Sequence, residues 1–310
     1  LGIKKITVSS LKMAEYFSAQ WDDITVAFPV NIREIKTINT LLSSITLNLL
    51  LESVFVLKFL EKNLTNKANV LLKLDAGYGR SGINIENLEE VNKIIEHSKK
   101  MKNLTLAGFL IHNGHTYSSR SIDDILSIHS KSMKKINFFH QKIVDNSNYV
   151  ISIGDTPSCS VINNYEKTIH EIRPGNLVFY DLAQWQIGSC KIEDIAIRMV
   201  CPVVSIHSDR NEAVIYGGAI HFSKDFIKIN KNKVFGYVYS SGSDIWSDNK
   251  SIGYLKLVSQ EHGIVKFYKI PERLHEGNLL SIIPVHSCLN ANLMKKYLTD
   301  DGKIIEMMKD

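Results

Sequence analysis

Residues 74–82 read Leu-Asp-Ala-Gly-Tyr-Gly-Arg-Ser-Gly and follow directly on an apolar run at 70–74. An apolar run of this length predicts a buried strand, and the glycines after it let other groups approach the backbone closely. Because strand ends of this kind carry many α/β active sites, the side chains of Asp75 and Arg80 are candidate site residues. A turn without a further role is the alternative for this stretch taken alone.

Strand and helix patterns alternate from the start of the chain to about residue 183. Short apolar runs predict the strands, and amphipathic runs between them predict the helices. We expect strands at 5–8, 24–28, 45–51, 70–74, 106–111, 149–153 and around 168–180, and helices at 10–20, 32–42, 54–64, 85–99 and 121–144. This alternation predicts an α/β fold with a parallel sheet or barrel.

The number of expected strands is one short of a closed barrel, because a (β/α)8 TIM-type barrel needs eight. The first expected strand begins at Lys5 with no helix before it, and the chain begins with Leu1 rather than methionine. Two interpretations follow: an open sheet, or a barrel whose first strand lies upstream of Leu1. The second is the working hypothesis, with the barrel over residues 1–185.

The helical period disappears after about residue 190. Runs separated by polar turns predict strands at 195–206, 213–216, 234–239, 252–257, 264–268, 279–284 and 303–308. These runs predict a second, mostly β domain over residues 186–310. A chain of 310 residues is long enough to build two such cores.

Charge and composition argue against several classes of protein. A net charge of +5 without a dense basic stripe argues against a nucleic-acid partner. No apolar run approaches the roughly 20 residues that a membrane span needs. Four cysteines without a CxxC pair predict reduced thiols and a cytoplasmic location.

Two glycine-containing stretches lie near the last two expected strands: GDTP at 154–157 follows the strand at 149–153, and RPGN at 173–176 lies around the last one. Barrels often bind phosphate with backbone N–H groups of the loops after these strands, and ordinary turns are the alternative. A carboxylate repels phosphate, so we expect Asp155 to point away and to cap a helix that starts near Pro157. The candidate phosphate ligands are Gly154, Thr156, Gly175 and Asn176.

The string IHNGHTY ends the expected strand at 106–111 and places two histidines and a tyrosine around a glycine. Imidazole and phenol groups at a strand end can stack on a flat ring and tune its protonation. Among these residues, His115 and Tyr117 are candidate catalytic residues. A structural role is the alternative for either histidine.

His286 and Cys288 lie two residues apart in the expected β domain. On extended chain, two such side chains point to the same side, and imidazole nitrogen and thiolate sulfur are both good zinc ligands. A two-ligand site with open positions suits a catalytic metal. The pair alone is a weak pattern, and further ligands are not evident from the sequence.

Together these motifs resemble the fold-type III pyridoxal-phosphate (PLP) enzymes, the alanine-racemase-like barrels, and within them the D-serine dehydratase / D-threonine aldolase branch. The matching strings are LDAGYGRSG, IHNGHTY, GDTP, RPGNLVFYD, GGAIHFSKD, SQEHG and PVHSCLNANL, in the order of that family. The resemblance implies PLP in the mouth of the barrel, zinc, a D-amino acid substrate, and a homodimer in which the partner's β domain closes the site.

The resemblance also implies a role for each candidate residue. Arg80 would lie near the ring hydroxyl with Asp75 beside it, and His115 and Tyr117 near the ring and the substrate. The phosphate would be held by Gly154, Thr156, Gly175 and Asn176, and zinc by His286 and Cys288. Asp155 departs from the small residue usual in the family. The Schiff-base lysine belongs upstream of Leu1, so none is assigned here, and residues 1–310 alone are predicted to be inactive.

The implied activity is that of a zinc-dependent PLP lyase that converts D-serine to pyruvate and ammonia. An HxC pair resembles the dehydratases, whereas the aldolases more often carry HxD, and this difference decides the first choice. Retro-aldol cleavage of the D-threonine aldolase type is the alternative, because it uses the same cofactor and metal. A non-catalytic PLP-binding barrel protein is the alternative from another class.

Overall fold

The computed structural model describes residues 2–143, 149–240, 246 and 250–308. The chain divides into two compact units, which we call the N-terminal unit (Leu1–Ser119 with Asp123–Pro174) and the C-terminal unit (Arg120–Ile122 with Gly175–Asp310). In the part of the chain that the structure describes, no helix is both long and apolar enough to cross a membrane.

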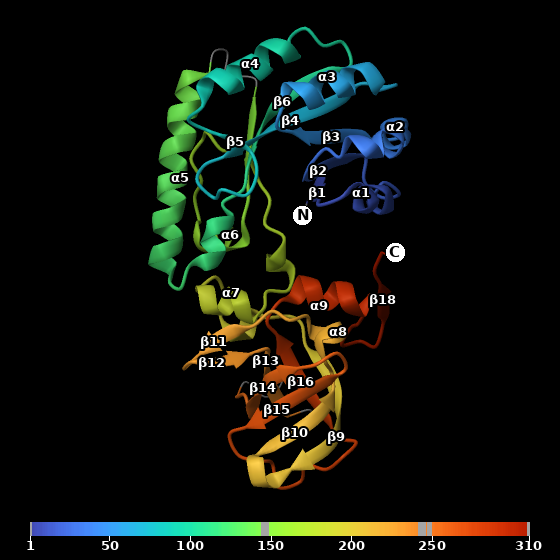
Figure 1. The fold of residues 1–310 in the computed structure, drawn as a ribbon, viewed down its shortest axis with the longest axis vertical. Helices are drawn as coiled ribbons and strands as arrows, with labels where there is room; N and C mark the ends of the chain where they lie inside the picture. The colour runs from blue at the N-terminus through green and yellow to red at the C-terminus, as the bar shows by residue number, and fades with distance from the viewer. Residues whose placement is uncertain (1, 144–148, 241–245, 247–249, 309–310) are drawn as a thin grey trace. The chain divides into compact units, whose positions relative to one another are not determined.

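The N-terminal unit is built on a row of parallel strands (Figure 1). In spatial order they are β1 (Ile6–Val8), β2 (Asp23–Pro29), β3 (Thr46–Leu51), β4 (Ala68–Asp75), β6 (Leu104–Ile111), β7 (Val150–Ile153) and β8 (Glu171–Ile172), and β5 (Ile83–Asn84) pairs with β4. All the predicted strands of this region are confirmed. The sheet curls into a half-barrel whose two ends are β1 and β8.

Helices connect these strands, and Figure 1 shows α3, α4 and α5 along the outer side of the sheet. The helices α1 (Leu11–Phe17), α2 (Ile35–Leu42), α3 (Val54–Asn63), α4 (Leu88–Ser98) and α5 (Ile122–Lys142) fall within the predicted runs. Residue Val144, the predicted end of the last run, lies outside the described residues. Side-chain caps fix three of the starts, since Ser10, Ser53 and Asn87 accept hydrogen bonds from Met13, Val56 and Glu90 N–H groups.

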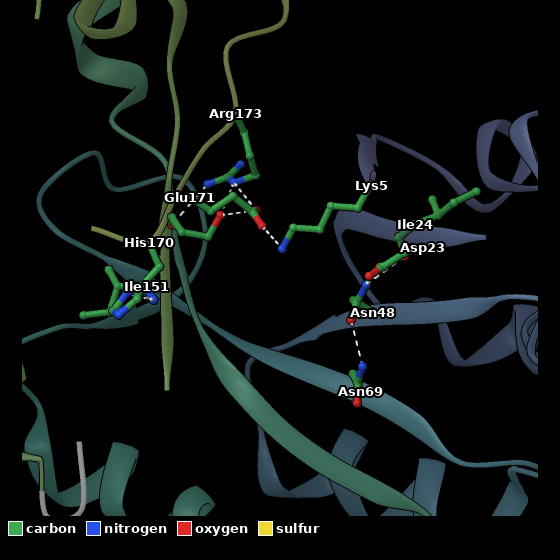
Figure 2. A network of polar contacts seen from close by, with 10 residues as sticks. Lys5, Asp23, Ile24, Asn48, Asn69, Ile151, His170, Glu171 and Arg173 are labelled. Atoms are coloured by element: carbon green, nitrogen blue, oxygen red, sulfur yellow. Dashed lines mark hydrogen bonds and ion pairs between the residues drawn. The ribbon is translucent and has the colours of Figure 1, made fainter. Parts of the chain in front are cut away.

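The two faces of the sheet differ in composition because side chains alternate along each strand. On β3, Leu47, Leu49 and Leu51 join the main core with the helices, whereas Leu50 joins a small apolar cluster. Polar groups also line the sheet, as Figure 2 shows: Asn48 Nδ2 donates to Asp23 Oδ1 at 2.7 Å. The ammonium group of Lys5, just before β1, pairs with the carboxylate of Glu171 on β8.

The C-terminal unit contains a closed antiparallel barrel of six strands. Around the barrel the order is β10 (Glu212–Tyr216), β15 (His262–Phe267), β14 (Gly253–Val258), β13 (Gly236–Ser240), β16 (Leu279–Pro284) and β9 (Met199–His207). Each of these strands overlaps a predicted one. The hairpins β11 (Ile227–Ile229)–β12 (Asn232–Val234) and β17 (Lys296–Leu298)–β18 (Ile304–Glu306) add to it, β18 within the predicted strand at 303–308.

The expectation of extended chain through residues 286–288 is wrong. Ser287–Met294 forms helix α9, and His286 is its N-cap residue. The sequence does not predict this helix, because its buried residues are Ser287, Asn290 and Ala291. Two of these are polar, so the spacing of apolar residues gives no helical pattern. Two further helices of this unit are α7 (Leu182–Ile187), whose N-cap residue Asp181 belongs to the site described below, and α8 (Ala219–Phe222).

Candidate active site

The loop after β4 is organised by the carboxylate of Asp75. Its Oδ1 accepts hydrogen bonds from the N–H groups of Gly77 at 2.9 Å and Tyr78 at 2.8 Å, and its Oδ2 accepts one from Gly79 at 2.9 Å. Burial alone would raise the pKa of Asp75, but these backbone donors lower it. Asp75 is therefore an ionised acid, and in this form it holds the loop that presents Arg80.

The loops after β4 and β6 meet through stacked side chains, and this contact through Tyr78 was not part of the sequence prediction. The guanidinium of Arg80 lies 5.2 Å from the ring centroid of Tyr78, which stacks on His115 at 6.1 Å and meets His112 edge-on at 5.8 Å. A Cβ atom at Gly114 would lie 2.2 Å from the Tyr78 ring, so glycine is required there for this approach. A layer of aromatic and cationic groups results, suited to a flat ligand.

His112 joins the end of β6 to the end of β7. Its Nδ1 donates to the carbonyl oxygen of Gly154 at 2.6 Å, because a carbonyl only accepts. The pKa of His112 is lowered to about 4, mainly by burial and also by the cations Arg80, Arg173 and Lys73, while the bond to Gly154 opposes this change. His112 is thus a neutral imidazole whose Nε2 can accept a hydrogen bond from a ligand.

The expectation for Asp155 is confirmed: it is the N-cap residue of helix α6 (Thr156–Val161). Its Oδ1 accepts from the Ser158 N–H at 2.7 Å and from the Thr116 hydroxyl at 2.9 Å, and burial raises the pKa of its carboxyl. The neighbouring Thr156 N–H donates to the hydroxyl of Tyr117 at 3.3 Å. The loops 112–117 and 154–158 are therefore tied together in the N-terminal unit.

Two cations in this region were not predicted as site residues. Lys73 is almost fully buried, its Nζ donates to the Leu74 carbonyl at 2.7 Å, and burial lowers its pKa to about 8. Arg173 donates to the Ile111 carbonyl at 2.6 Å and to the Ser152 hydroxyl at 2.7 Å. A lysine inside an otherwise apolar strand was the signal in the sequence that could have identified the first of these.

In the C-terminal unit, His286 and Cys288 contact each other despite the helix that replaces the expected strand. A hydrogen bond with Cys288 is the main reason that the pKa of His286 rises to about 9, and Asp225 raises it further. The same bond lowers the pKa of the Cys288 thiol. The Cys288 thiol therefore loses its proton more readily than an ordinary cysteine does.

Ser287, the residue between His286 and Cys288, is held by the carboxylate of Asp181. The Oδ2 of Asp181 accepts from the Ser287 N–H at 2.9 Å and from the Ser287 hydroxyl at 3.1 Å. The Asn176 amide donates to Asp181 Oδ2 at 2.8 Å and reaches Cys288 Sγ at 3.5 Å. Asn176, predicted to bind phosphate, thus supports the start of α9 in the described contacts.

The candidate phosphate ligands belong to different units: Gly154 and Thr156 to the N-terminal unit, Gly175 and Asn176 to the C-terminal unit. A joint role for all four stays a prediction. Within each unit, however, the predicted residues do come together. The ring-stacking group assembles around Tyr78, and the pair His286 and Cys288 assembles at the start of α9.

The donor set at the start of α9 suits a metal of the zinc type, since it pairs an imidazole nitrogen with a sulfur whose pKa is lowered. Among the described residues, no cluster of three or more His, Cys, Asp or Glu side chains could hold a metal. Any metal bound by this pair would keep open positions for water or substrate, as catalytic sites require.

Residues 2–182 match the family described as "Alanine racemase, N-terminal domain". The chain belongs to this family. Residues 196–299 match a second family, described as "Putative serine dehydratase domain". The predicted domain boundary at residue 185 lies between the two matched regions. The half-barrel followed by an antiparallel β unit is the alanine racemase-like fold, as the resemblance implied.

Two curated relatives are dehydratases of D-amino acids. The chain is 29% identical to the D-serine dehydratase of Dictyostelium discoideum, over 98% of this chain and 81% of the relative. It is 24% identical to the D-threo-3-hydroxyaspartate dehydratase of Delftia sp. strain HT23, over 98% of this chain and 83% of the relative. Both relatives therefore align across both units.

Solved structures share this fold. The D-threo-3-hydroxyaspartate dehydratase from Delftia superposes with a TM-score of 0.86 at 23% identity, covering 98% of this chain and 83% of that one. D-threonine aldolase from Filomicrobium marinum superposes with a TM-score of 0.81 at 15% identity, covering 98% and 81%. Two other solved structures are described as D-threo-3-hydroxyaspartate dehydratase variants. One carries a cysteine-to-alanine change and is in a metal-free form, and the other carries a histidine-to-alanine change two positions earlier.

Proposed function

We propose that this protein is a PLP-dependent lyase acting on D-β-hydroxy amino acids, with D-serine as substrate and pyruvate and ammonia as products. The observation that carries the proposal is the contact between His286 and Cys288, in which the thiol has a lowered pKa. Their order and spacing match the histidine and cysteine replaced in the two D-threo-3-hydroxyaspartate dehydratase variants. The similarity to D-serine dehydratases along nearly the whole chain supports the same reading.

The N-terminal unit fits PLP on several counts. Three cations, Lys73, Arg80 and Arg173, surround the neutral His112 and create a field that suits an anionic ligand. The layer of Arg80, Tyr78 and His115 suits an aromatic ring. When bound, PLP supplies an electron sink for negative charge at the substrate Cα.

The chain's own residues would orient that cofactor. Asp75 fixes the loop that presents Arg80 toward the ring hydroxyl, and His115 with Tyr117 would flank the ring and the substrate. We expect the phosphate to lie against the loop at Gly154 and Thr156. That loop is held in place because His112 binds the Gly154 carbonyl and Asp155 caps α6.

The pair His286 and Cys288 would hold Zn²⁺, and a bound zinc ion supplies Lewis-acid polarisation of the substrate β-hydroxyl. Asp181 and Asn176 keep the start of α9 in position for this role. The dehydratase proposal is preferred to retro-aldol cleavage because the second ligand is a cysteine. The structural likeness to D-threonine aldolase keeps cleavage as the second candidate.

Product analysis tests the proposal. Purified protein loaded with PLP and Zn²⁺ is given D-serine, D-threonine or L-serine, and pyruvate, ammonia, glycine and aldehyde are measured. We expect pyruvate and ammonia from D-serine, none from L-serine, and loss of turnover with a chelator that Zn²⁺ restores. Glycine and an aldehyde would identify the aldolase instead, and PLP binding without any product would favour the non-catalytic carrier.

Assembly and location stay predictions within this proposal. We expect a homodimer, and sedimentation velocity of the PLP-loaded protein measures its mass directly. The four cysteines, all among the described residues, form no disulfide with one another. Reduced thiols are what a cytoplasmic enzyme would keep, so fractionation of cells with a tagged protein is the matching experiment.

A further inference from the structure

The ring of His286 is held by an acid that lies far from it in the sequence. Nδ1 of His286 and Oδ2 of Asp225 are 2.7 Å apart. Asp225 lies in the short segment between α8 and β11, whereas His286 opens α9. A carboxylate only accepts, so the ring donates its Nδ1 hydrogen to Asp225.

Further hydrogen bonds hold the segments that carry Asp225 and His286. The Asp225 N–H donates to the Ser223 hydroxyl at 3.1 Å, and Ser223 takes a positive φ of 68° that turns the chain after α8. The Asn290 amide, on α9, donates to the His221 carbonyl at 2.6 Å and ties α9 to α8. The distance between Asp225 and His286 is therefore set by the packing of two helices.

The start of α8 is constrained in turn by the strand turn beneath it. A Cβ atom at Gly218 would lie 2.4 Å from the Gln260 carbonyl oxygen, so only glycine fits there. The Ala219 N–H donates to the Ser259 carbonyl at 2.7 Å. A rigid support of this kind is what an outer partner of a metal ligand needs, because it must hold the ring in one orientation.

The bond to Asp225 decides which ring nitrogen is available. Nδ1 cannot serve Asp225 and a metal ion at the same time, so a metal bound to His286 is bound through Nε2. A carboxylate on the far nitrogen also makes the metal-binding nitrogen a stronger donor. The backbone N–H of Ser287 donates to a different acid, Asp181. Asp181 therefore holds the backbone at the start of α9, and Asp225 holds the ring of His286.

We propose that Asp225 is the positioning residue of the metal site: it fixes the ring of His286 with Nε2 available, and so sets the affinity of the pair for a divalent cation. This inference rests on the proposed metal role of His286 and Cys288. Asp225 does not touch the cation itself. Its side chain is 51% exposed and that of His286 is 39% exposed, so we expect the bond to contribute little to the stability of the fold.

Zinc affinity of the PLP-loaded protein tests the proposal without relying on turnover. Competition with a chromophoric chelator is measured for the wild type and for Asp225→Ala and Asp225→Asn. We expect the alanine variant to bind zinc about 10- to 100-fold more weakly. The asparagine variant should lie between the two, because its oxygen still accepts the Nδ1 hydrogen but carries no charge. Asp209→Asn, on the same unit and with a side chain 72% exposed, is the matched control and should bind like the wild type.

A cobalt spectrum separates positioning from a merely structural role. Co²⁺ in the wild type should give a thiolate charge-transfer band together with ligand-field bands of a nitrogen-sulfur site. In Asp225→Ala we expect altered ligand-field bands with the thiolate band retained, and in Asp225→Asn a spectrum closer to the wild type. Unchanged spectra in both variants would contradict the proposal.

The outcomes distinguish the proposed metal role of His286 and Cys288 from the proposed positioning role of Asp225. A wild type that binds no zinc overturns the proposed metal role, and the inference with it. A wild type that binds zinc, with Asp225→Ala binding equally tightly, overturns the positioning role alone. If the alanine variant does not fold, the comparison of Asp225→Asn with the wild type decides the question.

Discussion

Two histidines, one in each unit, have pKa values displaced in opposite directions. Burial lowers the pKa of His112 to about 4, with Arg80, Arg173 and Lys73 adding to the effect. Contact with Cys288 and Asp225 raises the pKa of His286 to about 9. Burial disfavours the protonated form of both rings: at His112 the nearby cations add to this effect, whereas at His286 the bonds with Cys288 and Asp225 outweigh it. Each unit therefore sets a different role for the same side chain.

The two regions are also assembled differently. In the N-terminal unit, the groups around Tyr78 come from loops that directly follow strands β4 and β6. In the C-terminal unit, the three residues His286, Ser287 and Cys288 are held by Asp225, Asp181 and Asn176, which are 61, 106 and 112 residues away. The group around Tyr78 therefore follows from local sequence, whereas the group around His286 depends on contacts between residues far apart in the chain.

The largest effect is expected from removing the thiolate of the C-terminal pair. Cys288→Ser should reduce bound zinc from one ion per chain to almost none, because a serine hydroxyl is a poor zinc ligand. Metal content is measured by mass spectrometry after desalting. The matched control is Cys190→Ser, since burial raises the pKa of Cys190 to about 12 and makes it a poor ligand. Equal zinc loss in both variants would contradict the assignment.

The next largest effect is expected on the pH dependence of stability, because His112 is neutral in the folded protein. Its folded pKa of about 4 lies below the ordinary value of 6.5, so the unfolded chain binds the proton more readily. Stability should therefore fall as the pH drops from about 6.5 to about 4, by roughly 3 kcal/mol at most. NMR titration of the ring protons measures the pKa directly. An inflection near 6.5 would show that neither burial nor the nearby cations disfavour the protonated ring.

Replacing Asp155 sharpens the comparison within the N-terminal unit. Asp155→Ala should lower the free energy of unfolding by about 1–2 kcal/mol, because the α6 cap and the bond from Thr116 are both lost. Asp155→Asn should cost less, since its oxygen can still accept these bonds and burial already disfavours the charge. Urea unfolding compares the two. Equal losses would mean that the carboxylate charge itself is needed.

The smallest effect is expected for Asn176→Ala. Loss of the amide contacts to Asp181 and Cys288 should weaken zinc binding about threefold, within the usual net value of one hydrogen bond. Zinc and PLP affinities are both measured, by chelator competition and by absorbance titration. A selective loss of PLP affinity would instead support the phosphate role that the sequence predicted for Asn176.

The strands and the ring-stacking group could be predicted because their signals are local. Strand β4 is an apolar run, and Arg80 and His115 follow strand ends within a few residues. Helix α9 could not be predicted, since it buries Ser287 and Asn290 and shows no apolar period. Asp225 ends the matching string GGAIHFSKD, but its role could not be predicted, because its contact with His286 exists only after α8 and α9 have packed.

The ion pair between Lys5 and Glu171 has a consequence for how the row of parallel strands responds to acid. It connects the residue before β1 to β8, two strands that share no backbone pairing with each other in the described sheet. Burial would raise the pKa of Glu171, but Lys5 and the Ser152 hydroxyl lower it. The charge attraction between the first and last strands of the row should therefore persist until the pH falls below the range in which an ordinary glutamate is protonated.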